Sequence, residues 1–141
     1  MDDYRALENL VCSYAALVDA GDFAGVGALF AEGAFAGSGG VVRGAAEVER
    51  MLRESVIVYE DGTPRTQHVT TNIALEVSGP TASGRAYFTV LQAVPGFPLQ
   101  TIAAGRYEDR FTRTGRGWRF TERRATVDLV GDVSHHLWKH F

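Results

Sequence analysis

The stretch from Gly105 to Asp128, "GRYEDRFTRTGRGWRFTERRATVD", decides the fold class of this chain. Aromatic and apolar residues alternate with charged ones on both sides of "TGRG", a tetrapeptide of turn-forming residues. The pattern predicts two strands, at about Leu99–Thr112 and Trp118–Leu129, joined as a hairpin. The two strands should run antiparallel, because parallel neighbours need a long crossover connection.

Two more strands are predicted before this hairpin. The first is indicated by Val69 and the apolar residues that follow it at period two, and the second runs from about Arg85 to Val94. The segments "SGPTASG" and "PGFP" supply the turns after them. In a regular first strand, His68 would lie on the face opposite Val69, together with Thr70 and Asn72.

The N-terminal part of the chain has a helical pattern. An amphipathic helix is predicted from Asp2 to Ala20, a second one is capped by Asp22, and a third covers Ala45–Val56. The segment "AEGAFAGSGG" between the last two indicates a turn, one short strand and a flexible glycine loop. Helices followed by a meander predict an α+β domain in which a strongly bent, mainly antiparallel sheet wraps a long helix. We expect one domain over residues 1–141, with a core at 1–131 and a tail at 132–141.

Composition excludes several classes of function. The 141 residues are 45% hydrophobic and 22% charged, which is typical of a globular protein. A net charge of -3 gives no basic surface for nucleic acid. No apolar run has the length of a membrane span, and the N-terminus lacks the pattern of a signal peptide, so a cytoplasmic location is expected. The single cysteine, Cys12, lies in the apolar helical pattern, where a buried thiol is expected.

Two residues suggest chemistry, and each has two interpretations. His68 in "PRTQHVTTN" is either a polar residue at a strand start or a catalytic base, because imidazole titrates near neutral pH. Asp19 in "SYAALVDAGDF" lies at the edge of the buried face of the first helix, five residues after Tyr14. It is either a solvated helix-end carboxylate or the group that orients His68. The residues alone leave both interpretations open.

A resemblance favours the catalytic interpretation. The order of "YAALVDAGDFAGVGALFAEGAF", "RGAAEVERML", "RTQHVTTN" and the hairpin stretch resembles the SnoaL-like group of the cone-shaped α+β fold named after nuclear transport factor two. The similarity covers about Tyr4 to Asp128. Scytalone dehydratase, hexachlorocyclohexane dehydrochlorinase and bile-acid 7α-dehydratase in this group use an Asp on the first helix with a His at the start of a strand. Asp19 and His68 match those two residues, and Tyr14 matches a tyrosine near the reacting centre of the bile-acid enzymes.

The resemblance implies a cofactor-independent lyase, isomerase or cyclase that acts on a small hydrophobic molecule such as a polyketide, steroid or aromatic intermediate. His68 would be the general base, Asp19 its orienting carboxylate and Tyr14 a hydrogen-bond donor. Scytalone dehydratase also uses a second histidine from a later strand, but "LQTIAAGRYEDR" contains none, so a histidine pair is not expected here. A homodimer or other homo-oligomer is expected from the resemblance. The alternative is a non-catalytic protein of the same fold that binds a small ligand or assists another enzyme.

Further residues are candidates for contact with the substrate. They are aromatic or polar side chains predicted to line the cone: Phe23, Asn72, Phe88, Arg106, Arg124, Asp128 and Trp138. The polar ones could equally form cross-strand ion pairs, and the aromatic ones could be core. In the tail "SHHLWKHF", His136 and His140 are four apart, but a terminal segment more often packs over a neighbour, and no metal site is expected. Leu137, Trp138 and Phe141 could instead form a lid or contact another subunit.

Overall fold

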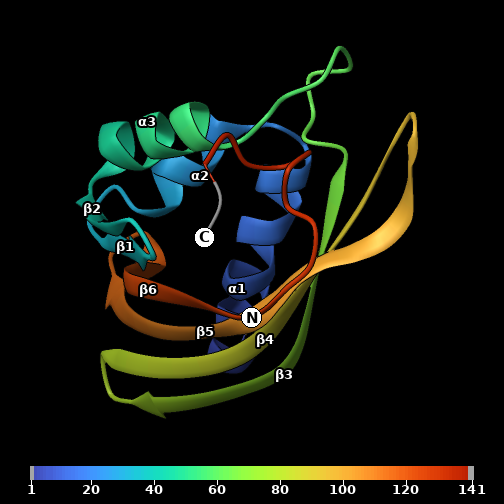
Figure 1. Cartoon of the computed structure of the whole chain (residues 1–141). Coiled ribbons are helices and arrows are strands. Elements are labelled where there is room, and N and C mark those ends of the chain that lie inside the picture. The colour runs from blue at the N-terminus through green and yellow to red at the C-terminus, as the bar shows by residue number, and fades with distance from the viewer. Residues whose placement is uncertain (1, 140–141) are drawn as a thin grey trace.

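The computed structural model describes residues 2–139 of the chain. Three helices and six strands follow one another along it (Figure 1): α1 Asp3–Asp19, α2 Phe23–Leu29, β1 Ala34–Gly37, β2 Gly40–Arg43, α3 Ala45–Ser55, β3 Thr66–Ser78, β4 Thr81–Val94, β5 Phe97–Thr114 and β6 Gly117–Val130. No helix within the described residues combines the length and the apolar character that a membrane span needs.

The strands form one sheet in the order β2-β1-β6-β5-β4-β3. Neighbouring strands are antiparallel except β1 and β6, which are parallel. The long strands curl around α1, and the sheet stays open between its edge strands β2 and β3 (Figure 1). The predicted α+β cone with a bent, mainly antiparallel sheet is confirmed.

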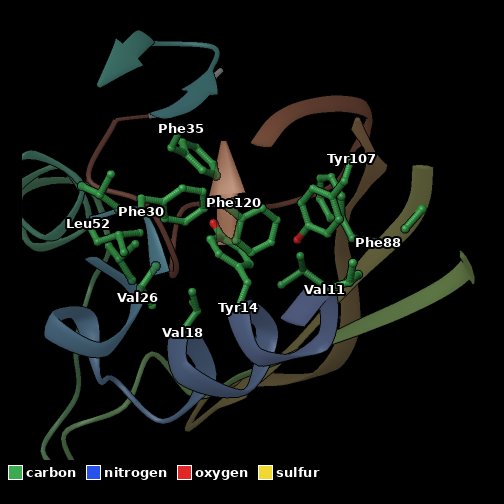
Figure 2. Close-up of a cluster of buried hydrophobic side chains, with 14 of the residues drawn as sticks. Val11, Tyr14, Val18, Val26, Phe30, Phe35, Leu52, Phe88, Tyr107 and Phe120 are labelled. Carbon is green, nitrogen blue, oxygen red and sulfur yellow. The ribbon is translucent and has the colours of Figure 1, made fainter. Parts of the chain in front are cut away.

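The concave face of the sheet packs on the apolar face of α1. Val11, Tyr14 and Val18 point from this helix towards the rings of the sheet, while α2 and α3 close one end with Val26 and Leu52 (Figure 2). The predicted helix is therefore correct in position and in its buried face. The prediction for Cys12 is wrong, because its side chain is exposed on the other face of α1.

A β-bulge in β3 changes which of its residues face the core. The pairing of β3 with β4 shifts between Thr71 and Ala74, and Asn72 has a φ of 55°, a left-handed conformation that an Asn tolerates better than most residues. Before the bulge His68 faces α1, and after it Ile73 packs on the core. The regular alternation predicted for this strand is wrong for that reason, since an extra residue reverses the two faces.

The prediction of a flexible glycine loop after the first short strand is also wrong in part. Residues Gly37 to Gly40 form a tight hairpin, with Gly40 at a φ of 110°, and a second short strand, β2, follows. Glycine adopts this φ without the clash that a Cβ would cause. Two short edge strands therefore replace one strand and a loop.

The convex face of the sheet is exposed, as Tyr87 of β4 shows, and Leu99, Leu129 and Val130 are further large apolar side chains exposed on the strands. A homo-oligomer in which this face is covered stays a prediction.

Candidate active site

The end of α1 places Asp19 beside the start of β3. Gly21 follows the helix with a φ of 75°, which is the usual conformation for ending a helix with glycine. A Cβ at Gly21 would lie 2.0 Å from the carbonyl oxygen of Gly62, so only glycine allows this close approach. The loop that contains Gly62 leads directly into β3, and the contact therefore fixes the distance between the helix end and the strand.

Asp19 accepts three hydrogen bonds from the first residues of β3. Its Oδ1 accepts one from Thr66 Oγ1 at 2.9 Å and lies 2.6 Å from His68 Nδ1, and its Oδ2 accepts one from the backbone N–H of His68 at 2.7 Å. The carboxylate therefore holds both the main chain and the ring of His68. The structure thus brings together Asp19 and His68, the pair predicted from the sequence, which we refer to as the dyad.

The hydrogen bond to Asp19 defines what the His68 ring can do. In a neutral imidazole whose Nδ1–H donates to a carboxylate, Nε2 carries the lone pair. The carboxylate also stabilises the imidazolium that forms when Nε2 takes a proton. The His68 side chain is 8% exposed, and that of Asp19 is 20% exposed. The pair has the arrangement of a general base with its orienting group.

Tyr14 lies deeper in the interior, on the same helix as Asp19. Its ring stacks on Phe35, with the centroids 5.7 Å apart, and meets Tyr107 edge to face at 5.8 Å (Figure 2). Burial raises the pKa of Tyr14 to about 12, against the opposing effect of the Arg123 guanidinium, so the phenol stays protonated near neutral pH. Within residues 2–139, no hydrogen bond or ring contact joins Tyr14 to His68, and the part of Tyr14 in the site stays a prediction.

Arg123 is a functional candidate that sequence reasoning missed. Its side chain is 0% exposed and forms two hydrogen bonds of 2.8 Å with Asp109. The guanidinium also lies 3.8 Å from the centroid of the Tyr107 ring and 5.0 Å from that of Tyr14. Its Nη1 is buried and has no hydrogen-bond partner in the described part of the chain. A protonated donor thus lies beside two phenols in the interior.

No pattern in the sequence pointed to Arg123. Trp118 and Phe120 set the phase of β6, and a regular alternation would place Arg123 on the outer face. The register of β5 and β6 shifts between Arg110 and Phe111, so that both Phe120 and Arg123 face inward. The charged side chain is buried because of this irregularity.

A second histidine lies beside the dyad, against the prediction that there is none. The ring of His136, in the segment after β6, lies edge to face with that of His68, with the centroids 6.1 Å apart. Burial, with the charge of His68 adding to it, lowers the pKa of His136 to about 4, although Asp19 opposes the shift. The prediction considered only strands as a source of the second histidine, whereas the C-terminal segment supplies it.

The structure separates most of the other predicted contact residues from the dyad. Phe23 and Phe88 are buried in the core, and Asn72 is the exposed residue of the bulge. Arg106 pairs with Asp128 at 3.0 Å on the exposed face of the sheet.

Two of the remaining candidates are exposed as well. The side chain of Arg124 lies 3.9 Å from Glu122 and is 51% exposed, and Trp138 is 66% exposed. Cross-strand ion pairing, the alternative interpretation of Arg106 and Asp128, describes the polar residues better than a cavity lining does. His140 and Phe141 lie outside the described residues, so the parts assigned to them stay predictions.

Among the hollows of the described surface are three of about 300 to 410 Å³, and none of these three is lined by the dyad. The largest lies among charged residues of the sheet such as Glu76, Arg85 and Glu108. The segment that carries His136 lies beside the dyad instead, with its imidazole in ring contact with that of His68.

These features define a class of protein: an α+β cone like that of nuclear transport factor two (NTF2-like), with a carboxylate–imidazole pair between its first helix and an edge strand. The SnoaL-like domain model matches residues 1–124, and the chain belongs to that family. The resemblance seen in the sequence is confirmed. Among curated proteins, none matches this chain in sequence.

Solved structures share the fold over most of the chain. A variant of Rv3472, a protein of unknown function from Mycobacterium tuberculosis, is 26% identical with a TM-score of 0.75, over 90% of this chain and 72% of that one. A candidate scytalone dehydratase from Novosphingobium aromaticivorans is 21% identical with a TM-score of 0.73, over 92% and 86%. A candidate dehydratase of the NTF2-like family from Streptomyces avermitilis is 19% identical with a TM-score of 0.71, over 91% and 97%.

Proposed function

We propose that this chain is a cofactor-independent lyase of the dehydratase type that acts on a small hydrophobic molecule. The observation that supports this most directly is the 2.6 Å contact between His68 Nδ1 and Asp19 Oδ1, which leaves Nε2 as a base. Two of the similar structures are candidate dehydratases, which agrees with the proposal. The substrate class is a polyketide, steroid or aromatic intermediate with a hydroxyl group β to a carbonyl.

In the proposed reaction, His68 Nε2 takes a proton from the carbon next to the carbonyl. The electron pair of that C–H bond forms a C=C bond, and the C–O bond to the hydroxyl breaks. The departing hydroxyl takes that proton from the His68 imidazolium and leaves as water, which returns His68 to its neutral form, so that atoms and charge balance. Asp19 stabilises the imidazolium, and the protonated phenol of Tyr14 donates a hydrogen bond to the carbonyl oxygen or to the departing hydroxyl.

A test uses 3-hydroxy-1-tetralone, a β-hydroxy ketone that gives 1-naphthol after it loses water and enolises. We expect the wild-type chain to form 1-naphthol, which is detected by its fluorescence. His68→Gln should lower the rate by about 100-fold or more, the usual effect of losing a general base. Gln67→Ala, which changes the neighbouring exposed residue, is the matched control. An unchanged rate in His68→Gln would contradict the assignment.

One observation favours the second candidate, a non-catalytic protein that holds a small ligand. The dyad is nearly covered, and the hollows described above do not reach it. This alternative predicts that hydrophobic ligands bind while no β-hydroxy ketone of a varied panel loses water. Binding titrations and product analysis on the same panel distinguish the two functions.

A further inference from the structure

The C-terminal segment after β6 lies over the dyad and is held there by main-chain pairing. It runs from the end of β6 past the end of α1 towards α3 (Figure 1). The N–H of Ile57 donates to the carbonyl oxygen of His136 at 2.8 Å, and the N–H of Trp138 donates to that of Ser55 at 3.0 Å. These bonds flank the antiparallel bridge between Val56 and Leu137. We refer to residues 131–139 as the C-terminal strap.

Side chains attach the strap at a second place. The carbonyl oxygen of His135 accepts hydrogen bonds from Tyr59 Oη at 2.5 Å and from Gln92 Nε2 at 3.0 Å. The His135 ring stacks on Phe97, with the centroids 4.1 Å apart. The strap therefore presents His136 to the dyad in one orientation, while the ring of His135 points to a different part of the molecule.

Polar atoms near the dyad lack partners in the described chain. His136 is 7% exposed, and its buried Nδ1 has no hydrogen-bond partner among residues 2–139. Thr70, two residues after His68 on the same face of β3, has a buried and equally unpartnered Oγ1. Asp19, at Nδ1, is the only hydrogen-bond partner of the His68 ring among residues 2–139. Since buried polar groups in proteins are nearly always paired, two unpaired buried atoms on residues next to His68, one in its strand and one in ring contact with it, indicate a polar ligand group.

We propose that His136 is a substrate-binding residue and that it and His68 hold one hydroxyl oxygen of the substrate between their rings. The inference rests on the dyad site of the proposed function. The centroid separation of 6.1 Å suits two imidazoles that share an oxygen through hydrogen bonds of about 2.8 Å. A neutral imidazole can donate to this oxygen or accept from it, and His136 stays neutral near neutral pH.

The strap then also acts as a lid. With His136 in place, His68 is almost fully covered, so a substrate reaches Nε2 only when the strap lifts. After the strap closes again, His136 completes the set of polar groups around the substrate hydroxyl. The site thereby selects molecules that carry a hydroxyl group at the position of the reaction.

The first test compares the binding of 2-tetralol with that of tetralin, which lacks only the hydroxyl. Neither compound has the carbonyl group that the reaction needs, so both stay unchanged during the measurement. The wild-type chain should bind 2-tetralol about 10-fold more tightly, the value of one buried hydrogen bond. His136→Phe keeps a ring but removes both nitrogens, and it should lower this ratio several-fold, to what the remaining hydrogen bond with His68 contributes. His135→Phe, on the same strap, should keep the wild-type ratio. A ratio that is unchanged in His136→Phe, or no binding of either compound to the wild type, would overturn the proposal.

The second test locks the strap. In an antiparallel bridge flanked by hydrogen bonds, as at Val56 and Leu137, the side chains are close enough for a disulfide. In the triple variant Cys12→Ser, Val56→Cys, Leu137→Cys, oxidation should slow 2-tetralol association at least 10-fold, and a reductant should restore it. Equal association rates in both states would overturn the lid. Both tests measure binding, so a failure of 1-naphthol formation would overturn the proposed function and leave this inference to be judged separately.

Discussion

Asp19 accepts hydrogen bonds from the first residues of β3, and these bonds have two purposes. The bond from Thr66 Oγ1 and the one from the His68 backbone fix the carboxylate, and the contact with Nδ1 fixes the imidazole. An amide at this position would keep the shape but could also donate to Nδ1, which would favour the wrong tautomer.

The first prediction follows from this geometry. Asp19→Asn should lower the rate of 1-naphthol formation from 3-hydroxy-1-tetralone by about 100-fold or more while the fold is retained. Asp22→Asn is a matched control, because Asp22 caps α2 and Asn caps helices equally well. The initial rates of the two variants are compared under the same conditions. Similar rates in Asp19→Asn and wild type would mean that the carboxylate does not act through His68.

The second prediction concerns pH and His136. The pKa of this residue is about 4 in the folded chain, against about 6.5 in the unfolded chain, so the unfolded state binds more protons below pH 6.5. The contribution of His136 to the free energy of unfolding is therefore fully present above pH 6.5. It is lost as the pH falls towards 4, by up to about 3 kcal/mol. Urea unfolding at several pH values measures this. His136→Gln should show a smaller fall between pH 6.5 and 4 than wild type does, and parallel curves would refute the assignment.

At the scale of elements, the bulge in β3 decides the site. It allows Thr66, His68 and Thr70 to face α1 at one end of the strand while Ile73 and Leu75 pack on the core at the other end. A strand without the bulge could satisfy only one of these two sets, because one-residue shifts exchange the faces. The left-handed Asn72 is thus part of the local structure that orients the base.

The third prediction tests this residue. Asn72→Val should destabilise the chain by about 1–2 kcal/mol, because a β-branched side chain is strained at a φ of 55°. Asn72→Gly removes that strain and should be close to wild type in stability. Both are measured by urea unfolding. Should the valine variant equal the glycine variant, Asn72 would not be left-handed in solution.

At the scale of the whole molecule, the interior of the cone contains an ion pair among aromatic rings. Arg123 and Asp109 lie on neighbouring strands, and their side chains are 0% and 1% exposed. Removal of one partner leaves a buried charge without compensation, which usually costs more than the pair itself contributes.

The fourth prediction is that Asp109→Asn destabilises the chain by about 3–5 kcal/mol. Asp128→Asn, which removes the carboxylate of the exposed pair with Arg106, should change stability by only a small part of that amount, because solvent screens surface charges. Thermal and urea unfolding of the two variants give the comparison. Equal effects would show that the buried pair is not isolated from solvent.

Much of the architecture follows from the sequence by itself. The period of the apolar residues in α1 and the alternation on both sides of "TGRG" predicted the long helix, the antiparallel hairpin and the α+β class. These patterns reflect local geometry, because apolar residues recur every three to four positions in a helix with one buried face and every second position in a strand. Such a period can be read from neighbouring residues alone. The motif resemblance added Asp19 and His68 as partners.

The tertiary structure alone decided three features of the site. The bulge at Asn72 turned His68 inward, the register shift before Phe111 buried Arg123, and the strap placed His136 against the dyad. Each depends on pairing with a distant segment, and a register shift or a docked terminus leaves no periodic pattern in the chain. Sequence thus determined which elements form, whereas long-range packing determined which polar side chains meet, because burial outweighs the local preference of a single residue.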